Sequence, residues 1–326
     1  MKAIVVSQPG PPEVLELREI PTPAVRPGWV LVRVKAFGLN RSEMFTRQGH
    51  SGAAVQFPRV LGIECVGIVE DPSDSQLQRG QTVAAVMGGM GRQFDGGYAQ
   101  YCLLPVTQVM PITTHLPWDQ LAAIPETYLT AWGCLLDAIG LKNGDTLLAR
   151  GGTSSVGMAA IALGKSLGCS VVATTRNPAK SDALKSVGAQ HVLIDEGVIA
   201  PEVKRTLVSG ATGVLELIGT STLLDSLQCA APGGVVCYAG MLGGQWSLER
   251  FEPMPAIPST VKLTVYTTHI VTAANSTAAL QRLIQDVEAG RLPLNLDRVY
   301  RFHEIAQAHR DMEDNRATGK LVVTVD

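Results

Sequence analysis

Residues Asp145–Gly157 form the stretch whose chemistry is easiest to recognise in this sequence. A short β-prone run ends in the pair Gly151-Gly152, small hydroxyl residues follow, and apolar residues then recur at helical spacing over 158–165. This order predicts a strand, a glycine-rich turn and the start of a helix. Backbone N–H groups at such a helix start, with no bulky side chains before them, suit a pyrophosphate. We therefore expect a dinucleotide to bind at Gly152, Thr153, Ser154, Ser155 and Val156.

The end of the following strand predicts which dinucleotide binds. A carboxylate there would accept the ribose 2′-OH of NAD, but this strand ends Thr174-Thr175-Arg176-Asn177-Pro178-Ala179-Lys180. Two hydroxyls and two cations can instead contact a 2′-phosphate, and guanidinium matches phosphate geometry. The pattern predicts NADPH, held by Thr174, Thr175, Arg176 and Lys180. The alternative is that Arg176 and Lys180 are ordinary cations at a helix start.

Two later strand ends offer room for the nicotinamide ring. Ile218-Gly219 and Ala239-Gly240-Met241 follow the fourth and fifth strands of the same unit. A hydride donor needs a dry slot at the carboxyl ends of such strands. We expect both segments to contact the cofactor, although either is also compatible with a plain turn from strand to helix.

The metal-ligating residue types show no convergent spacing. The N-terminal part offers His50, His115, Cys65 and Cys102, and two carboxylates alone are poor zinc ligands. The six cysteines are scattered without a Cys-x-x-Cys pair, so neither a disulfide framework nor a zinc knuckle is predicted. We expect no metal ion, and Glu64 is predicted to be a hydrogen-bonded structural acid rather than a catalytic one.

These segments must be positioned by two different kinds of structure. Residues 1 to about 122 contain many short strands punctuated by Pro and Gly, which favours a compact, barrel-like β domain. From there apolar strands alternate with helices, the doubly wound α/β pattern of a parallel sheet covered on both faces. The closing run 321–325 is a strand that we expect to join the first domain's sheet. The predicted domains are thus 1–122 with 270–326, and an inserted 123–269, with the active site in the cleft between them.

The bulk composition excludes several classes of protein. The chain has 326 residues, of which 46% are hydrophobic and 17% charged, with a net charge of −2. It can bury a large core, and nothing favours binding to nucleic acid or to an anionic membrane. The sequence offers no signal h-region and no apolar run long enough to span a bilayer. We expect a cytoplasmic protein.

In combination, several motifs resemble the medium-chain dehydrogenase/reductase superfamily, in its zinc-free quinone oxidoreductase branch, along the whole chain. The resemblance implies a GroES-like catalytic domain and a Rossmann domain. The matching stretches are Gly38-Leu-Asn40-Arg-Ser-Glu43, Pro58-Arg-Val-Leu-Gly-Ile-Glu64-Cys-Val-Gly-Ile-Val69, Asp95-Gly-Gly-Tyr98-Ala-Gln-Tyr101, the helix residues Thr127, Thr130 and Ala131, and Ala317-Thr-Gly319-Lys320.

Departures from the family pattern are equally informative. Zinc-dependent relatives carry Cys where this chain has Asn40 and His where it has Ile63, and the four-cysteine zinc lobe is missing. The resemblance therefore implies no zinc alcohol dehydrogenase activity. Many reductases of the superfamily place a Tyr just after the segment 40–49, where this chain has His50-Ser51. The resemblance thus leaves the proton donor unidentified.

The resemblance implies hydride transfer from NADPH to a quinone or to the activated double bond of an α,β-unsaturated carbonyl. Donors to the developing oxyanion would be Asn40, Tyr128, His50 or Ser51, with solvent as the default proton source. A 2-enoyl-thioester reductase and a non-catalytic, crystallin-like NADPH-binding protein are the alternatives. Relatives pair across a two-fold axis, so we expect a homodimer through strand 261–266. The expected cofactor contacts are completed by Asn40, Thr127, Thr267, Thr268 and Lys320.

Overall fold

The computed structural model describes residues 1–325. The described residues divide into two compact units, one formed by 1–129, 268–290 and 296–325 and the other by 130–267 and 291–295. The sequence-based boundaries lie at 122/123 and 269/270, whereas here α3 (Pro125–Trp132) spans the first transition. Within residues 1–325 no helix is both long and apolar enough to cross a membrane.

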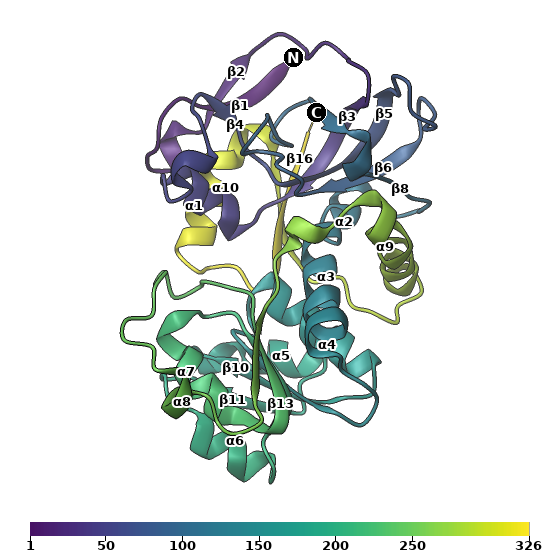
Figure 1. Cartoon of the computed structure of the whole chain (residues 1–326). Helices are drawn as coiled ribbons and strands as arrows, with labels where there is room; N and C mark the ends of the chain where they lie inside the picture. The colour runs from purple at the N-terminus through teal and green to yellow at the C-terminus, as the bar shows by residue number, and fades with distance from the viewer. Residues whose placement is uncertain (326) are drawn as a thin grey trace. The chain divides into compact units, whose positions relative to one another are not determined.

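The first unit is rich in short strands, as its Pro- and Gly-punctuated sequence predicts, and it contains both ends of the chain (Figure 1). Its elements are β1 (Lys2–Val6), η1 (Pro12–Val14), β2 (Glu16–Glu19), β3 (Trp29–Gly38), α1 (Arg41–Arg47), η2 (Gly52–Ala54), β4 (Arg59–Val60), β5 (Glu64–Asp71), β6 (Thr82–Val86), β7 (Tyr101–Pro105), η3 (Val106–Gln108), β8 (Val109–Pro111), α2 (Trp118–Leu121), η6 (Thr268–Ile270), α9 (Ala273–Glu288), β15 (Leu296–Arg301), η7 (Phe302–Glu304), α10 (Ile305–Glu313) and β16 (Lys320–Thr324).

Two sheets make up the first unit. One has the order β2-β1-β4, and the other has seven strands, ordered β15-β16-β3-β5-β6-β8 with β7 also paired to β3. The closing strand β16 pairs antiparallel with β3, with Val322 opposite Gly38, which confirms the predicted return of the chain end to this sheet. The pairing brings Lys320 near the residues that follow β3. Val, Ile, Leu and Phe side chains from both sheets form one buried core.

The second unit alternates strands and helices. Its elements are η4 (Gly133–Ile139), β9 (Thr146–Arg150), α4 (Ser155–Ser166), β10 (Ser170–Thr175), η5 (Pro178–Lys180), α5 (Ser181–Val187), β11 (His191–Ile194), α6 (Ala200–Thr206), β12 (Ala211–Glu216), α7 (Thr220–Cys229), β13 (Ala230–Tyr238), α8 (Pro253–Ala256) and β14 (Lys262–Val265).

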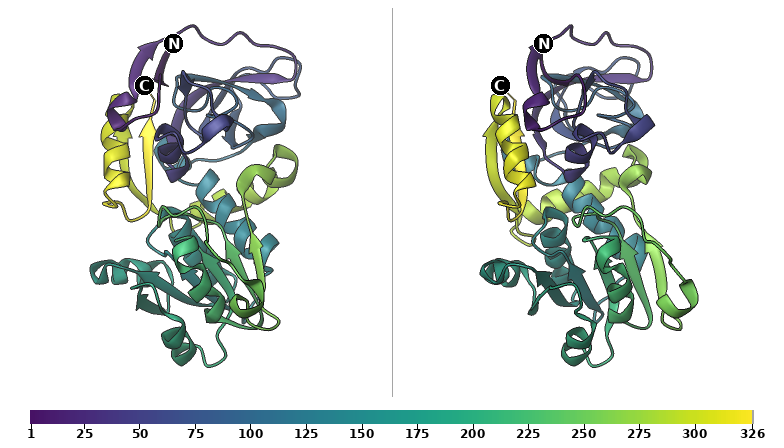
Figure 2. Two further views of the ribbon diagram at one scale, coloured as in Figure 1. Left: turned by 60° about the vertical axis from the view of Figure 1, so that its left-hand side comes forward. Right: turned by 90° about the vertical axis from the view of Figure 1, so that its left-hand side faces the viewer.

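All neighbouring strands of this sheet are parallel, in the order β11-β10-β9-β12-β13-β14, which confirms the doubly wound prediction. Helices α4 and α5 pack together, as do α6 and α7, and Figure 2 shows helices on both sides of the sheet. The central strands β9, β10 and β12 are buried on both faces, which explains why their sequences are mostly continuous apolar runs rather than alternating ones.

One expected helix has an irregular second half. The apolar residues over 128–139 recur at helical spacing and predict one helix, but the α-helix ends at Trp132 and the chain continues as wider, π-type turns over Gly133–Ile139. The ring of Tyr266 packs against Gly133 so closely that a Cβ on this glycine would lie 1.9 Å from the Tyr266 Cζ atom. A hydrophobic pattern at helical spacing does not reveal this close approach, because Tyr266 lies far from Gly133 in the sequence.

Candidate functional site

The carboxyl edge of the parallel sheet gathers four of the predicted cofactor segments. Strand β9 lies between β10 and β12, and β13 is the next neighbour of β12. The chain leaves β9 toward β10 but continues from β12 toward β13, so the switch point between β9 and β12 is where such sheets bind ligands. The segments that follow these strands are Gly152–Val156, Thr174–Lys180, Ile218–Gly219 and Ala239–Met241.

The glycine turn after β9 depends on close backbone approaches. Gly151 has φ +87°, a conformation that favours glycine. A Cβ on Gly157 would lie 2.5 Å from the Gly151 carbonyl oxygen, so the first turn of α4 packs directly on the loop. Ser154 caps this helix by accepting a hydrogen bond from the Gly157 N–H at 3.1 Å. The N–H groups of Ser155 and Val156 are left at the helix start, where they suit a phosphate.

Two threonines at the end of β10 support the loop, and the two cations are the more accessible side chains. Thr174 Oγ1 accepts from the Gly151 N–H at 3.0 Å and donates to Asp195 Oδ2 at 3.3 Å. Thr175 Oγ1 is bonded to the backbone of Asn177. Both threonines are buried, whereas Arg176 is exposed and Lys180 is half-buried. Direct contact with a 2′-phosphate is therefore available foremost to Arg176, and Thr174 acts through the turn.

A buried ion network beneath this loop escaped the sequence reasoning. Arg150, the last residue of β9, is fully buried and donates to both carboxylate oxygens of Asp195 at 2.8 and 3.0 Å. A third donor reaches Asp225 at 2.8 Å. Burial alone would raise the pKa of Asp195, but hydrogen bonds and charge from Arg150 hold it below its ordinary value. The sequence feature that could have predicted this network is the arginine at the end of the mostly apolar strand β9.

The end of β12 is fixed by its own carboxylate. Glu216 is fully buried, and its Oε1 accepts from the N–H groups of Ile218 at 2.6 Å and Gly219 at 2.9 Å. Gly219 has φ +121°, so a glycine is favoured at this bend. Ala239, Gly240 and Met241, which follow β13, are half-buried. A hydrogen bond of 2.7 Å from the Gly243 N–H to the Ile218 carbonyl links the two segments.

In the first unit, a second polar cluster brings together residues that are far apart in the sequence. Lys320 Nζ donates to Glu64 Oε1 and to Asn40 Oδ1, both at 2.6 Å. The Asn40 Nδ2 group donates to Glu64 Oε1 at 3.0 Å and to Glu43 Oε1 at 3.3 Å. Lys320, Glu64 and Glu43 are each only 1% exposed. Because both ends of the Asn40 amide are engaged, its donation to a substrate would require breaking one of these bonds.

Gly38 makes room for this ion pair. A Cβ on Gly38 would lie 2.3 Å from Lys320 Cε and 2.4 Å from Glu64 Oε1. Because Gly38, at the end of β3, has no side chain, Lys320 at the start of β16 can reach Glu64 at the start of β5. The motif containing Gly38 and Asn40 was noticed in the sequence, but its steric role follows from the pairing of β3 with β16.

A third buried carboxyl adjoins the pair. The backbone N–H of Glu126 donates to Glu64 Oε2 at 3.0 Å, and its own side-chain Oε1 accepts from Thr268 Oγ1 at 3.0 Å. Glu126 is 8% exposed and Thr268 is 6% exposed. The neighbouring Thr127 is 1% exposed, and its hydroxyl has no hydrogen-bond partner among residues 1–325. Glu126 was not singled out from the sequence, because an acid in the first turn of a helix is common.

The protonation of these carboxyls departs from the ordinary pattern. Burial raises the pKa of Glu43 to about 7, although hydrogen bonds and Lys320 oppose it. Burial and the nearby charge of Glu64 raise the pKa of Glu126 to about 8. One ammonium thus stands among three buried acids, and Glu126 keeps its proton at neutral pH.

His50 and Ser51 lie at the opposite end of α1 from Asn40. His50 is exposed and Ser51 is half-buried, and both follow α1, whereas Asn40 precedes it. Seven helical residues separate the two ends of α1 by about 10 Å. Ser51 Oγ is bonded to Thr46 Oγ1 at 2.8 Å. Tyr128 is fully buried, and burial raises its pKa well above the ordinary value, a direction that keeps its hydroxyl neutral. Thr267 is exposed beside the buried Thr268.

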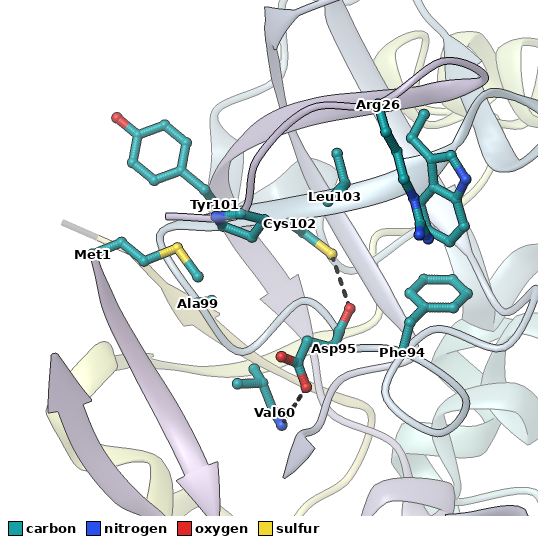
Figure 3. A pocket seen from close by; sticks show the side chains of 12 residues that line it. Met1, Arg26, Val60, Phe94, Asp95, Ala99, Tyr101, Cys102 and Leu103 are labelled. Atoms are coloured by element: carbon teal, nitrogen blue, oxygen red, sulfur yellow. Dashed lines mark hydrogen bonds between the residues drawn. The ribbon is translucent and has the colours of Figure 1, made fainter. Parts of the chain in front are cut away.

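A small cavity of about 150 Å³ in the first unit is separate from this cluster (Figure 3). The Arg26 guanidinium lies 4.0 Å from the centre of the Trp29 ring, and Phe94 meets that ring edge-on. Asp95 accepts from the Val60 N–H at 3.1 Å, and the Cys102 thiol points to the Asp95 carbonyl oxygen. None of the predicted catalytic or cofactor residues lines it.

Metal ligands do not converge anywhere in the described chain. Within residues 1–325, no three His, Cys, Asp or Glu side chains are arranged to hold a metal ion. Where Glu64 and Asn40 present oxygens to one point, the Lys320 ammonium lies between them.

Two known family models match separate parts of the chain. Residues 26–114 match the family model described as "Alcohol dehydrogenase GroES-like domain". Residues 187–323 match the model described as "Zinc-binding dehydrogenase".

Similar proteins cover the whole chain. A quinone oxidoreductase of Sus scrofa is 28% identical over 99% of this chain and 97% of its own length. The crystal structure of a quinone oxidoreductase from Pseudomonas syringae pv. Tomato DC3000 is 26% identical with a TM-score of 0.90, covering 99% of both chains. A structure described as an NAD-dependent alcohol dehydrogenase is 27% identical with a TM-score of 0.87, covering 100% of both.

Proposed function

We propose that this chain, which belongs to the quinone oxidoreductase-like group of the medium-chain dehydrogenase/reductase superfamily, reduces a quinone or an α,β-unsaturated carbonyl with NADPH and without zinc. The observation that carries the proposal is the Lys320 ammonium between Glu64 and Asn40. A fixed ammonium at this point repels a metal ion, and the family's zinc ligands are replaced here by Asn40 and Ile63. The residues therefore do not fit a catalytic zinc.

The residues of the second unit do fit a dinucleotide. The N–H groups at the start of α4 would hold the pyrophosphate, and the glycine turn lets the backbone approach it. Arg176 would hold the 2′-phosphate, while the ends of β12 and β13 would border the nicotinamide. When bound, NADPH supplies a hydride. The chain's own part is to orient the reactants, exclude water and provide donors to the oxygen that becomes negative.

One assay tests the reaction class. NADPH oxidation should be followed with a panel of quinones, enones and 2-enoyl thioesters, before and after dialysis against a chelator. We expect turnover with quinones or enones that the chelator leaves unchanged. Turnover with 2-enoyl thioesters alone would favour the enoyl-thioester reductase alternative. Tight NADPH binding without any turnover would favour the non-catalytic, crystallin-like alternative.

Replacing Arg176 by alanine should change the cofactor preference. Loss of a charge-assisted hydrogen bond of about 1.5–3 kcal/mol should weaken NADPH binding about ten- to a hundredfold. The affinity for NADH should stay within about twofold, because NADH lacks the 2′-phosphate. Titration of cofactor fluorescence gives both dissociation constants, and Lys204→Ala, an exposed change in α6, is the matched control. An unchanged ratio of the two constants would refute the assignment.

We also propose a homodimer through the edge strand β14. This strand ends the six-stranded sheet, pairs on one side with β13, and presents Val265 with 60% exposure. An uncovered apolar edge of this kind is suited to pairing with a second copy. Sedimentation equilibrium at micromolar concentration should return twice the chain mass of 34.6 kDa. A monomer mass would reject the proposal.

A further inference from the structure

The polar cluster of the first unit contains three buried carboxyl groups but only one ammonium group, which is more acid than a structural ion pair requires. Lys320 pairs directly with Glu64, and its charge also acts on the carboxyls of Glu43 and Glu126. Each of these groups is more than nine-tenths buried. One ammonium can balance one carboxylate, and in a poorly solvated interior the remaining acids are favoured in their neutral form.

Hydrogen bonding distinguishes the three acids. Glu64 accepts N–H donors from Lys320, Asn40 and the Glu126 backbone, and the Lys320 donor is charged. Glu43 accepts from the backbone N–H groups of Asn40 and Ile63 and from the Asn40 amide. The side chain of Glu126 instead meets a hydroxyl, that of Thr268. A hydroxyl can donate and accept at the same time, so this contact tolerates a protonated carboxyl.

The contact between Glu126 and Thr268 also leads outward. Thr268 begins the short turn η6, and its neighbours Thr267, His269 and Ile270 are exposed. The buried carboxyl is thus one hydroxyl away from a turn that reaches solvent. Resting on the proposed reduction, we infer that Glu126 is the proton reservoir of the reaction and that the Thr268 hydroxyl passes its proton to the reduced substrate.

The step balances without another reactant. Once the hydride has been added, the substrate carries an oxyanion, which forms an O–H bond with the proton of Thr268. Thr268 recovers a proton from the Glu126 carboxyl, whose O–H bond breaks and leaves a carboxylate beside Lys320. A proton from solvent then restores Glu126. Glu126 acts through Thr268 rather than on the substrate, and it supplies the donor that the missing Tyr left unidentified.

Glu126→Gln is the principal test, because the amide keeps the shape and an acceptor oxygen for Thr268. The wild-type turnover should fall as pH rises through about 8, since an acid must be protonated to donate. At pH 7 the variant should turn over about a hundredfold more slowly. The turnover of the variant should not fall as pH rises through about 8, so the wild-type and variant rates should converge above this pH. The exposed change Glu19→Gln on β2 is the matched control.

Thr268→Val should reproduce the loss because it removes the hydroxyl, and Thr268→Ser should restore most of the rate. These variants keep the test decisive if Glu126→Gln is poorly folded. Wild-type turnover and pH dependence in both Glu126→Gln and Thr268→Val would overturn the inference.

A readout without cofactor separates this inference from the proposed function. Infrared titration of the cofactor-free protein should show the carbonyl band of a protonated carboxyl that disappears as pH rises through about 8. This band should be absent in Glu126→Gln, where the remaining carboxyl band should be that of Glu43, which disappears at lower pH, as pH rises through about 7. If the wild-type band that disappears near pH 8 is present while no acceptor oxidises NADPH, the proposed function fails. The inference that Glu126 holds a proton is then retained. If turnover occurs but no such band is seen, the reservoir is refuted and the proposed function stands.

Discussion

Replacing Lys320 by methionine is expected to lower the free energy of unfolding by about 3–5 kcal/mol, the cost of leaving a buried partner charge unpaired. Methionine retains the length of the lysine stem but removes the ammonium. Glu64 then loses its cation at a site that is 1% exposed, and Asn40 Oδ1 loses its donor.

Denaturant titration followed by circular dichroism measures this loss. Lys185→Met is the matched control: its side chain is 58% exposed and lies 3.7 Å from the exposed Asp182. Exposed pairs contribute about 0–1 kcal/mol, so this variant should remain close to the wild type. The double variant Lys320→Met with Glu64→Gln should recover part of the stability, because the orphaned charge is gone. Equal midpoints for Lys320→Met and Lys185→Met would contradict the structural role of the pair.

The sequence predicts the cofactor edge better than the acid cluster, for a physical reason. In a doubly wound sheet the carboxyl ends of parallel strands meet at one edge, so Gly152–Val156, Arg176 and Ile218–Gly219 come together once the strands are recognised. Strand recognition needs only continuous apolar runs and glycines, which are local signals. The side-chain functions at this edge were less predictable, since Thr174 and Thr175 are turned to the loop itself.

The cluster around Lys320 depends instead on long-range pairing. Asn40 and Lys320 were both predicted to be site residues, and Glu64 was predicted to be a hydrogen-bonded structural acid; its contacts confirm the hydrogen bonding. Their contact requires β16 to pair with β3, across 280 residues of sequence, and the spacing of residues does not encode that register. Glu126 was not identified from the sequence. Its interest depends on its contacts with Glu64 and Thr268, which the sequence of its own helix does not reveal.

The two clusters share one construction. In each unit a buried cation pairs with a buried carboxylate and also contacts a second polar side chain, Asn40 in the first unit and Asp225 in the second. Lys320 fixes Asn40 at the start of α1, and Arg150 fixes Asp195, which holds Thr174 and through it the glycine turn. Pairs of this kind add little net stability over apolar packing, but removing one partner is costly. We therefore expect their removal to disturb function as well as folding.

Replacing Arg150 by methionine should show both effects in the second unit. The change leaves Asp195 and Asp225 without the cation that contacts them at 2.8 Å, and we expect a loss of about 3–5 kcal/mol in unfolding free energy. Asp195 then loses its fixed place against Thr174, whose hydroxyl receives the Gly151 N–H. NADPH binding should therefore weaken by at least about tenfold, the equivalent of 1.4 kcal/mol.

The stability difference between the wild type and Arg150→Met should depend on pH in a definite direction. Arg150 holds the pKa of Asp195 below its ordinary value, so the pair stabilises the fold above the unfolded pKa of about 4 and ceases to do so as pH falls through the folded pKa. The stability gap between wild type and Arg150→Met should be full at pH 7 and should narrow on acidification, as Asp195 becomes neutral in the variant. Arg205→Met, an exposed change in α6, should stay within about 0.5 kcal/mol of the wild type. A gap that is unchanged between pH 7 and pH 4 would show that Arg150 acts through packing alone, and unaltered NADPH affinity would separate the network from the glycine turn.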